Sequence, residues 1–403
     1  MSGLYDEPLV GASGPLVGVR VVDVTRARAG PTCVRQLSDL GADVVQVRPP
    51  AGGGLFPTTG SDGANLHRNK RSMAIDLSRE GGRDVLVRLV ERADVFVENF
   101  RPAVKHRLGI DPESLWAVNP RLVYASISGF GQEGPYASRP GVDQIAQGMG
   151  GLMSVTGPPG EGPWRAGIAV SDTAAGTFLT QGVLAALFAR ERTGRGQWVH
   201  TSLLESMINF MDFQAVRWLI DGEVAGQTGN EHPTIVPMGT FATADGYLNV
   251  APVFEFGRFC TLVGVPALAD DPRFADYTAR HAHREELTTE LGRVFRTRAS
   301  AEWMGILGDD MPCGPVLHID EVFADPQVRE LNLTRSVVHP DGHPIDVLRY
   351  PVTLSDTPAT IRAGVAREGA HTRDVLTELG YTEEDIVALR AAGVITTEEG
   401  DRA

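Results

Sequence analysis

Short apolar runs alternate with helical patterns through the first third of the chain. Residues 19–24 form a β-rich apolar run, and the pair Gly30-Pro31 separates this run from a segment with apolar residues at helical spacing. The alternation continues with expected strands at 43–47, 72–77, 94–97 and 122–127 and an expected helix at 79–93. Short strands that alternate with helices predict an α/β fold, in which helices cover both faces of a parallel sheet.

The pattern changes twice farther along the chain. Residues 129–167 contain many glycines and prolines and few periodic stretches, which predicts a long loop region of the kind that is usually functional. A strongly apolar helix is expected over 172–190, followed by a strand at 197–203 and a helix that continues to Leu219. From about Thr240, short strands and helices follow a different spacing.

These changes predict two domains in a chain of 403 residues, which exceeds the usual size of one compact domain. The first part of the large domain is expected at residues 1–224, and the smaller domain at 225–325. Residues 326–403 contain a strand-like run and two helical segments, and we expect them to return to the large domain.

The composition is that of a folded soluble protein, with 42% apolar and 22% charged residues. No apolar run approaches the roughly 20 residues of a membrane span, and residues 1–18 do not resemble a signal peptide. The cysteines Cys33, Cys260 and Cys313 are far apart and form no CxxC motif, which indicates a reducing cytoplasm and no zinc site. The net charge of −14 argues against nucleic acid as a partner.

The usual cofactor motifs are missing from the sequence. The first strand–helix junction, residues 25–31, lacks the glycines of a dinucleotide-binding turn, so a nicotinamide enzyme is disfavoured. There is also no GxxxxGK[ST] phosphate loop, no HExxH zinc motif and no GxSxG nucleophile motif. The sequence thus disfavours these four kinds of chemistry.

Asp172 is the most informative acidic residue. It follows the apolar run 166–170 and opens a helix whose next residues, 174–176, are small enough to permit the close approach of a ligand or another backbone. A carboxylate at a helix N-terminus is stabilised by the helix dipole and by free N–H groups. Most aspartates at such positions are simple N-caps, so the position alone does not make Asp172 a nucleophile.

A series of short motifs runs along nearly the whole chain. It consists of Ala29-Gly30-Pro31, Leu40-Gly41-Ala42-Asp43-Val44, Asn69-Lys70-Arg71-Ser72, Asp76-Leu77, Glu98-Asn99-Phe100-Arg101-Pro102, Asn119-Pro120-Arg121-Leu122, Ser128-Gly129, Gly134-Pro135-Tyr136, Arg139-Pro140-Gly141, Gly194-Arg195-Gly196-Gln197, Asp245-Gly246 and Gly314-Pro315-Val316. No single motif is specific. The ordered series resembles the class III (CaiB/BaiF-type) CoA-transferases, the family that includes formyl-CoA transferase, carnitine CoA-transferase and the α-methylacyl-CoA racemases.

The resemblance implies a Rossmann-like large domain, a smaller α+β domain and a homodimer of two interlocked, ring-like chains. It implies coenzyme A, carried as a thioester by substrate and product, and neither a metal nor a redox cofactor. The CoA contacts implied by the resemblance are Arg26, Ala27, Arg28, Ala29, Ile75, Ser78, Asn99, Phe100, Arg101, Arg107 and Arg139. The implied substrate pocket contains Val142, Asp143, Met238 and Gly239. Arginine side chains suit this ligand because they bind phosphate groups bidentately.

The resemblance also implies a role for Asp172. The nucleophilic aspartate of the family follows an apolar stretch and precedes a nearby glycine, as Asp172 and Gly176 do. The implied reaction is covalent catalysis, in which this carboxylate attacks a donor thioester and forms first an aspartyl–acyl anhydride and then an aspartyl–CoA thioester. The acceptor acid opens the thioester through a second anhydride, so the site has to exclude water and stabilise oxyanions.

Three places along the chain depart from the family pattern. The racemase branch has histidine where this chain has Val142, and valine cannot act as an acid or a base, so racemisation is disfavoured. Gln46 and Arg48 replace the usual lysine and glutamate after the second strand, and Met238-Gly239 stands where some transferases have a glycine-rich lid. The leading hypothesis is a CoA-transferase for a small or medium carboxylic acid. An acyl-CoA racemase or isomerase and a catalytically degenerate CoA-binding protein are the alternatives.

Overall fold

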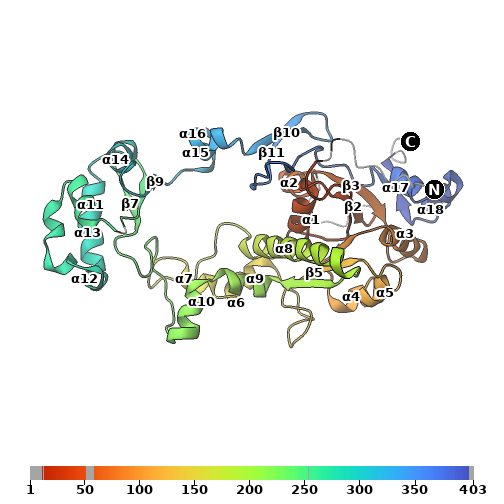
Figure 1. Ribbon diagram of the computed structural model, residues 1–403, viewed down its shortest axis with the longest axis horizontal. Coiled ribbons are helices and arrows are strands. Elements are labelled where there is room, and N and C mark those ends of the chain that lie inside the picture. The colour runs from red at the N-terminus through yellow and green to blue at the C-terminus, as the bar shows by residue number, and fades with distance from the viewer. Residues whose placement is uncertain (1–10, 12, 51–58, 253, 399–403) are drawn as a thin grey trace. The chain divides into compact units, whose positions relative to one another are not determined.

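The computed structural model describes residues 11, 13–50, 59–252 and 254–398. Within these residues, the apolar runs of the first half form neighbouring strands of a seven-stranded sheet (Figure 1). The strands are β1 (Arg20–Asp23), β2 (Asp43–Arg48), β3 (Lys70–Ile75), β4 (Val95–Glu98), β5 (Val123–Ser128), β6 (Trp198–Ser202) and β12 (Ile395–Thr396). Their order is β12-β3-β2-β1-β4-β5-β6, and all pairs are parallel except β12 with β3. The predicted α/β fold with a mainly parallel sheet is confirmed. Strands are added on one side of β1 up to β3 and on the other side from β4 to β6, so the switch point of the strand order lies between β1 and β4.

Helices cover both faces of this sheet because successive strand residues point to opposite faces. Val21 and Val44 pack into a core with α1 (Ala29–Asp39) and α8 (Val170–Thr193). The neighbouring strand residues, such as Val22 and Val45, pack into a second core on the other face. That core also receives side chains from α3 (Glu80–Glu91), α17 (Thr372–Glu378) and α18 (Glu383–Ala391). Burial on both faces explains why the strands read as continuous apolar runs.

The remaining elements around the sheet are short. They are α2 (Ser61–His67), α4 (Pro102–Leu108), α5 (Pro112–Trp116), α6 (Asp143–Met149), α9 (Leu203–Phe210), α10 (Phe213–Val216) and the hairpin of β10 (Thr334–Val338) and β11 (Pro344–Leu348). The helix α7 (Leu152–Val155) begins at the boundary between this part of the chain and the next. One expectation was wrong: the helix expected through Leu219 is broken after α9, where Asp212 takes a positive φ of 45°. The region 129–167 is rich in loops, as expected, and its regular elements within the described residues are the short helices α6 and α7.

A second, smaller sheet is antiparallel, with strands β7 (Gly239–Ala242), β8 (Tyr247–Val250) and β9 (Cys313–Pro315) in that order. Its helices are α11 (Phe256–Leu262), α12 (Tyr277–Ala282), α13 (Arg284–Phe295), α14 (Ser300–Leu307), α15 (Ile319–Ala324) and α16 (Pro326–Leu331), with a π-helix at Arg217–Asp221 and 3₁₀ turns at Pro266–Ala269 and Pro272–Phe274. Phe295 stacks on Phe241 with ring centroids 4.8 Å apart, and Trp303 completes this aromatic core.

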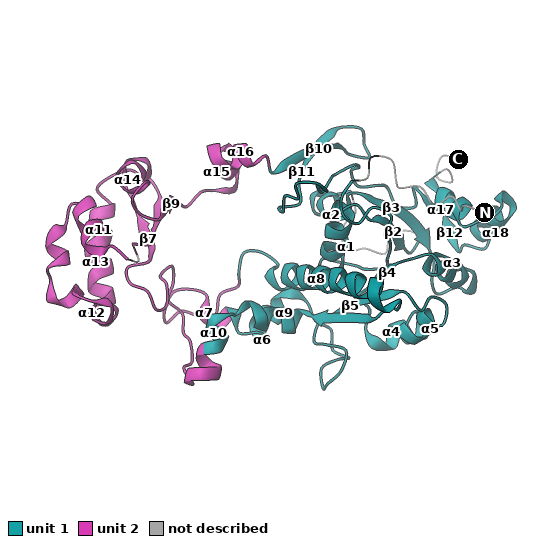
Figure 2. Cartoon of the chain, in the orientation of Figure 1, with its two compact units in different colours: residues 1–152, 166–216, 333–403 teal, residues 153–165, 217–332 magenta. Residues whose placement is uncertain are grey.

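The chain divides into two compact units (Figure 2). Unit 1 contains Met1–Leu152, Ala166–Val216 and Leu333–Ala403, and unit 2 contains Met153–Arg165 and Arg217–Asn332. These limits differ from the expected domain boundaries after residues 224 and 325, because the π-helix and α16 belong with the smaller sheet. Among the described helices, none combines the length and the apolar character needed to cross a membrane.

Candidate active site

Asp172 lies in the first turn of α8, three residues after the N-cap Ala169. It is therefore not the N-cap, and its carboxylate accepts no hydrogen bond from any residue that the structure describes. A half-buried carboxylate without a hydrogen-bond donor is uncommon, because burial without compensation raises the free energy of the charged form. The capping explanation that the sequence left open does not apply to this side chain.

The start of α8 lies against the start of α1. A Cβ atom added to Gly176 would lie 2.6 Å from the carbonyl oxygen of Ala29 and 2.8 Å from Cβ of Thr32, so only glycine permits this approach. One turn farther along, the Thr180 hydroxyl reaches the carbonyl oxygen of Cys33 at 3.4 Å. The small residues after Asp172 thus serve the helix–helix contact that holds this carboxylate beside the loop between β1 and α1.

A hydrogen-bond network joins α6 to the segment that precedes Asp172. Asp143 is buried, and its Oδ1 accepts hydrogen bonds from the backbone N–H of Ser171 at 2.9 Å and from the Ser171 hydroxyl at 2.8 Å. Its Oδ2 accepts a hydrogen bond of 2.7 Å from Nε2 of Gln147, whose Oε1 in turn accepts from the N–H of Ala166 at 3.0 Å. We call Asp143, Gln147, Ser171 and Asp172 the acidic corner.

The electrostatics of the acidic corner separate its two carboxylates. Burial, together with the nearby negative charge of Asp143, raises the pKa of Asp172 to about 6, although the guanidinium of Arg28 acts in the opposite direction. Arg28 forms an ion pair of 2.7 Å with Asp62, so its charge is shared. Asp143 is fully committed to hydrogen bonds, whereas the oxygens of Asp172 are available to a substrate.

A cavity of about 280 Å³ lies where β1, β2 and β3 end, beside α4. Its lining residues are Val24, Arg26, Val47, Arg48, Pro49, Ile75, Asp76, Leu77, Ser78, Phe100, Val104, Arg107 and Leu108. Among these described residues, three are arginines and only Asp76 is an acid, so the cavity suits an anion. We call this cavity the arginine pocket. Ligands of open α/β sheets bind outside the carboxyl ends of the strands, which is where it lies.

The loop between β1 and α1 forms one wall of the arginine pocket and is held from two sides. Asn99 brackets the backbone of Arg26, because its Oδ1 accepts the Arg26 N–H at 2.9 Å and its Nδ2 donates to the Arg26 carbonyl at 2.7 Å. Ala27 has a positive φ of 60°, an unfavourable value for a residue with a side chain. Such a conformation persists only where the surrounding contacts impose it.

A buried ion pair lies at the base of the same loop. Nζ of Lys70 contacts Oδ2 of Asp23 at 2.9 Å, and both side chains are at most 1% exposed. Oδ1 of Asp23 accepts hydrogen bonds from the N–H and the hydroxyl of Thr25, at 2.9 and 2.6 Å. Next to Lys70, Nδ1 of His67 accepts a 2.8 Å hydrogen bond from Nε2 of Gln46, and burial lowers the pKa of His67 to about 2. This neutral histidine and the paired charges support the loop from below.

The structure brings together only some of the CoA contacts implied by the resemblance. The residues that line the arginine pocket are Arg26, Ile75, Ser78, Phe100 and Arg107. Ala27, Ala29 and Asn99 shape the adjoining loop, and Arg28 forms an ion pair with Asp62 while its charge acts on Asp172. Arg101 is exposed and precedes α4. Arg139 is also exposed; its guanidinium lies 4.0 Å from the ring centre of Tyr136, and it does not line the pocket.

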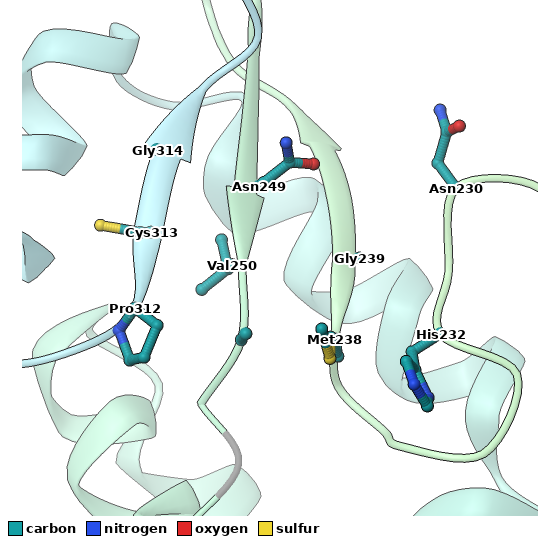
Figure 3. A pocket seen from close by; sticks show the side chains of 10 residues that line it. Asn230, His232, Met238, Gly239, Asn249, Val250, Pro312, Cys313 and Gly314 are labelled. Carbon is teal, nitrogen blue, oxygen red and sulfur yellow. The ribbon is translucent and has the colours of Figure 1, made fainter. Parts of the chain in front are cut away.

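The four residues of the implied substrate pocket fall in different units. Val142, the N-cap of α6, is 63% exposed, and Asp143 belongs to the acidic corner. Met238 and Gly239 line a cavity of about 400 Å³ in unit 2 (Figure 3). The other lining residues of this unit 2 pocket are Asn230, His232, Asn249, Val250, Ala251, Pro312, Cys313 and Gly314.

The unit 2 pocket is electrically neutral. Among its described lining residues, only His232 and Cys313 titrate; burial lowers the pKa of His232 and raises that of Cys313. Arg284 holds the loop of His232 in place, because its Nη1 donates to the His232 carbonyl at 2.9 Å. Pro312 and Cys313 lie on one side of β8, and Met238 and His232 on the other (Figure 3). The lining therefore offers apolar surface and amide groups rather than charge.

Sequence reasoning missed several residues of these sites. Arg48 lines the arginine pocket, although the sequence showed it only as a departure from the family pattern. Gln147 and Ser171 had no signal in the sequence, because their roles depend on a contact between segments that are far apart in the chain. The position of Arg48 directly after a buried apolar run was the only available sign for any of the three.

The chain is similar to named proteins over most of its length. The family model of CoA-transferase family III matches residues 16–372. The succinate–glutarate CoA-transferase of Agrobacterium fabrum is 38% identical over 92% of this chain and 96% of its own length. The acetyl-CoA:oxalate CoA-transferase of Acetobacter aceti is 35% identical over 84% and 90%. The crystal structure of a CAIB/BAIF family protein from Brucella suis superposes with a TM-score of 0.80 at 36% identity, covering 91% of this chain and 100% of that one.

Proposed function

This chain belongs to CoA-transferase family III, and we propose that it moves CoA from an acyl-CoA donor to a carboxylic acid through covalent intermediates on Asp172. The observation that carries the proposal is the carboxylate of Asp172, which accepts no hydrogen bond from a described residue and lies beside the loop that borders the arginine pocket. CoA transfer is also what the names of its relatives state.

The first half of the reaction consumes the donor. An oxygen of Asp172 attacks the thioester carbonyl carbon, the C–S bond breaks, and the CoA thiolate leaves with the electron pair. The product is a mixed anhydride between Asp172 and the acyl group. The thiolate then attacks the carbonyl carbon of the Asp172 side chain, and the donor acid leaves as a carboxylate. Asp172 now carries CoA as a thioester.

The second half reverses these steps with a different acid. The acceptor carboxylate attacks the Asp172 thioester, CoA thiolate leaves, and a second anhydride forms. Thiolate attack on the acyl carbon of this anhydride gives the new acyl-CoA and frees the Asp172 carboxylate. The raised pKa of Asp172 supports the nucleophile role. Burial raises the free energy of the charged carboxylate, so forming a neutral acyl derivative is more favourable for Asp172 than for a carboxylate in water.

The arginine pocket supplies cations for the phosphates of CoA in this proposal. Arg26 and Arg107 line it, and the resemblance adds Arg28, Arg101 and Arg139 as further contacts. Val142, Asp143, Met238 and Gly239 are proposed to shape the acyl and acceptor sites. The relatives named above act on small carboxylic acids, so we propose a small acid as the acceptor.

We also propose the interlocked homodimer. Large apolar side chains are exposed on unit 1, including Phe188 at 67% and Ile168 at 66%, and a subunit interface would remove such side chains from water. The three cysteines are free, which fits a reducing cytoplasm. The acyl-CoA racemase alternative lacks support at Val142, because a valine cannot move a proton.

A trapping experiment tests the proposed chemistry. The enzyme is incubated with a panel of acyl-CoA donors and small acids, treated with borohydride or hydroxylamine, and digested for mass spectrometry. The peptide that contains Asp172 should carry the modification, and Asp172→Asn should neither turn over nor be modified. Asp374→Asn is a matched control, since Asp374 is an exposed acid in the first turn of α17.

Three outcomes separate the candidate functions. Equal turnover by wild type and Asp172→Asn would refute the role of Asp172. Exchange of the α-proton with solvent deuterium would indicate an isomerase instead. CoA binding without turnover over the whole panel would indicate a degenerate CoA-binding protein.

A further inference from the structure

We propose that Arg48 binds the ribose 3′-phosphate of CoA and makes this chain discriminate CoA from its 3′-dephosphorylated form. The proposal rests on the proposed function, because it takes CoA as the occupant of the arginine pocket. It adds a specificity-determining residue to that site.

The position of Arg48 in the sheet is the first observation. Arg48 is the last residue of β2, which pairs with β1 on the side opposite β4. In doubly wound sheets with the order 3-2-1-4-5-6, a nucleotide lies across the carboxyl ends of the strands, and its ribose lies near the end of β2. An acid there binds a ribose hydroxyl, whereas an arginine accommodates a phosphate on the ribose. This chain has the same strand order and an arginine at that place, and the ribose of CoA carries a 3′-phosphate.

The bonding state of Arg48 is the second observation. Its Nη1 is buried and has no hydrogen-bond partner, and no ion pair joins its guanidinium to a described residue. A buried cationic group without a partner raises the free energy of the folded protein, so such groups are normally paired or bound to a ligand. Burial lowers the pKa of Arg48, which reflects the same cost. The guanidinium therefore requires an anion that none of the described residues supplies.

The charges around Arg48 do not satisfy it. Glu368 and Asp23 act on it from a distance, and Arg26 repels it. Asp23 is neutralised by Lys70. The one acid that lines the pocket, Asp76, accepts hydrogen bonds from the N–H and hydroxyl of Ser78 at 3.0 and 2.6 Å.

The three arginines of the pocket come from three places, which separates their roles. Arg26 belongs to the loop between β1 and α1, where pyrophosphate binds in sheets of this order. Arg107 belongs to α4, on the other wall. Arg48 alone lies at the end of β2. Replacing Arg48 should therefore weaken the binding of one group, the 3′-phosphate. Replacing Arg107 should leave the preference for CoA over its dephosphorylated form unchanged.

Calorimetric titration with CoA and with 3′-dephospho-CoA tests the proposal. The wild type should bind CoA roughly 10- to 100-fold more tightly, the range expected for hydrogen bonds to a charged group. In Arg48→Gln the ratio should fall below about 3-fold because CoA binding weakens, while the affinity for dephospho-CoA stays nearly constant. Arg107→Gln is the matched control and should keep the wild-type ratio. Thermal melting of each variant checks that the fold is intact.

The outcomes are distinguishable from a failure of the proposed function. Equal weakening of both ligands in Arg48→Gln, or an unchanged ratio, would overturn the role of Arg48. Equal binding of both ligands by the wild type would overturn it as well, with the CoA site intact. If the wild type binds neither ligand, the CoA site of the proposed function fails. Glu368→Gln should keep the wild-type ratio of the affinities for CoA and dephospho-CoA. If this variant loses the preference for CoA, Arg48 is assigned to an ion pair with Glu368.

Discussion

The acidic corner and the arginine pocket lie at the same loop of unit 1 and have opposite character. The acidic corner gathers two carboxylates, Asp143 and Asp172, and burial makes one of them hard to ionise. The arginine pocket gathers three guanidiniums and only one acid. Charges of like sign lie close together in each of them, which is electrostatically unfavourable. A substrate whose electrophilic carbonyl reacts with Asp172 and whose phosphates pair with the arginines would relieve both.

This difference teaches that chemistry and binding are separated in space. Groups of the acidic corner should change kcat, because they act on the reacting carbonyl. Groups of the arginine pocket should change KM, because they contact the same phosphates in the ground state and in the transition state. The predictions that follow test this separation.

The largest effect is expected from Asp172→Ala. Loss of the nucleophile should lower kcat by at least about 1,000-fold, since no other carboxylate of the acidic corner is free to replace it. Acyl-CoA affinity, measured by titration, should change by less than about 3-fold because the phosphate contacts are intact. A loss of affinity as large as the loss of kcat would contradict the separation.

The next effect concerns pH and Asp143. Asp172 must be ionised to attack, so kcat/KM should fall about tenfold per pH unit below the pKa of about 6 and level off above it. Asp143→Asn removes a negative charge that raises this pKa, so the acid limb should move to lower pH. The variant should also lose about 10- to 100-fold in kcat, because the NH2 group of asparagine cannot accept the hydrogen bond from Gln147 that Oδ2 of Asp143 accepts, and this disturbs the network around Ser171. Profiles of kcat/KM for both proteins test the shift, and a limb that stays in place would count against the coupling.

Arg107→Gln tests the other side of the comparison. Removing one cation from the arginine pocket should raise the KM for acyl-CoA by about 10-fold and leave kcat within about 3-fold. Steady-state kinetics at saturating acceptor acid measure both constants. A fall in kcat with an unchanged KM would place Arg107 at the reacting end instead.

The smallest effect is on stability. For Asp172 the folded pKa lies above the unfolded value, so the folded state binds more protons and stability is lost as pH rises from about 4 to 6. Asp172→Asn removes that loss and should stabilise the protein by about 1 kcal/mol at pH 7, with the gain vanishing near pH 4. Urea unfolding at pH 4 and pH 7 measures this difference in the free energy of unfolding.

Asp143→Asn should instead destabilise the protein at pH 7, because it breaks a buried hydrogen-bond network.

The sequence by itself determined the parts of this protein that depend on local spacing. Buried strands read as apolar runs because helices cover both sheet faces, and the helix expected at 79–93 is α3, whose apolar residues lie on one buried face. The ordered motifs led to the family. They also led to Asp172 and to five of the residues that line the arginine pocket.

Only the tertiary structure decided the rest. Asp143 and Ser171 are 28 residues apart, and their hydrogen bonds exist only because α6 packs beside the start of α8. The short helix α6 within the loop-rich region was not predicted, because polar residues such as Asp143 and Gln147 form much of its buried face and give no apolar period. Arg48 looked like a mere departure from a motif until the sheet placed it, unpaired, in a pocket with two other arginines. The physical reason is the same in each case: spacing along the chain encodes which elements form, whereas the charge and hydrogen bonding of a site depend on which elements meet.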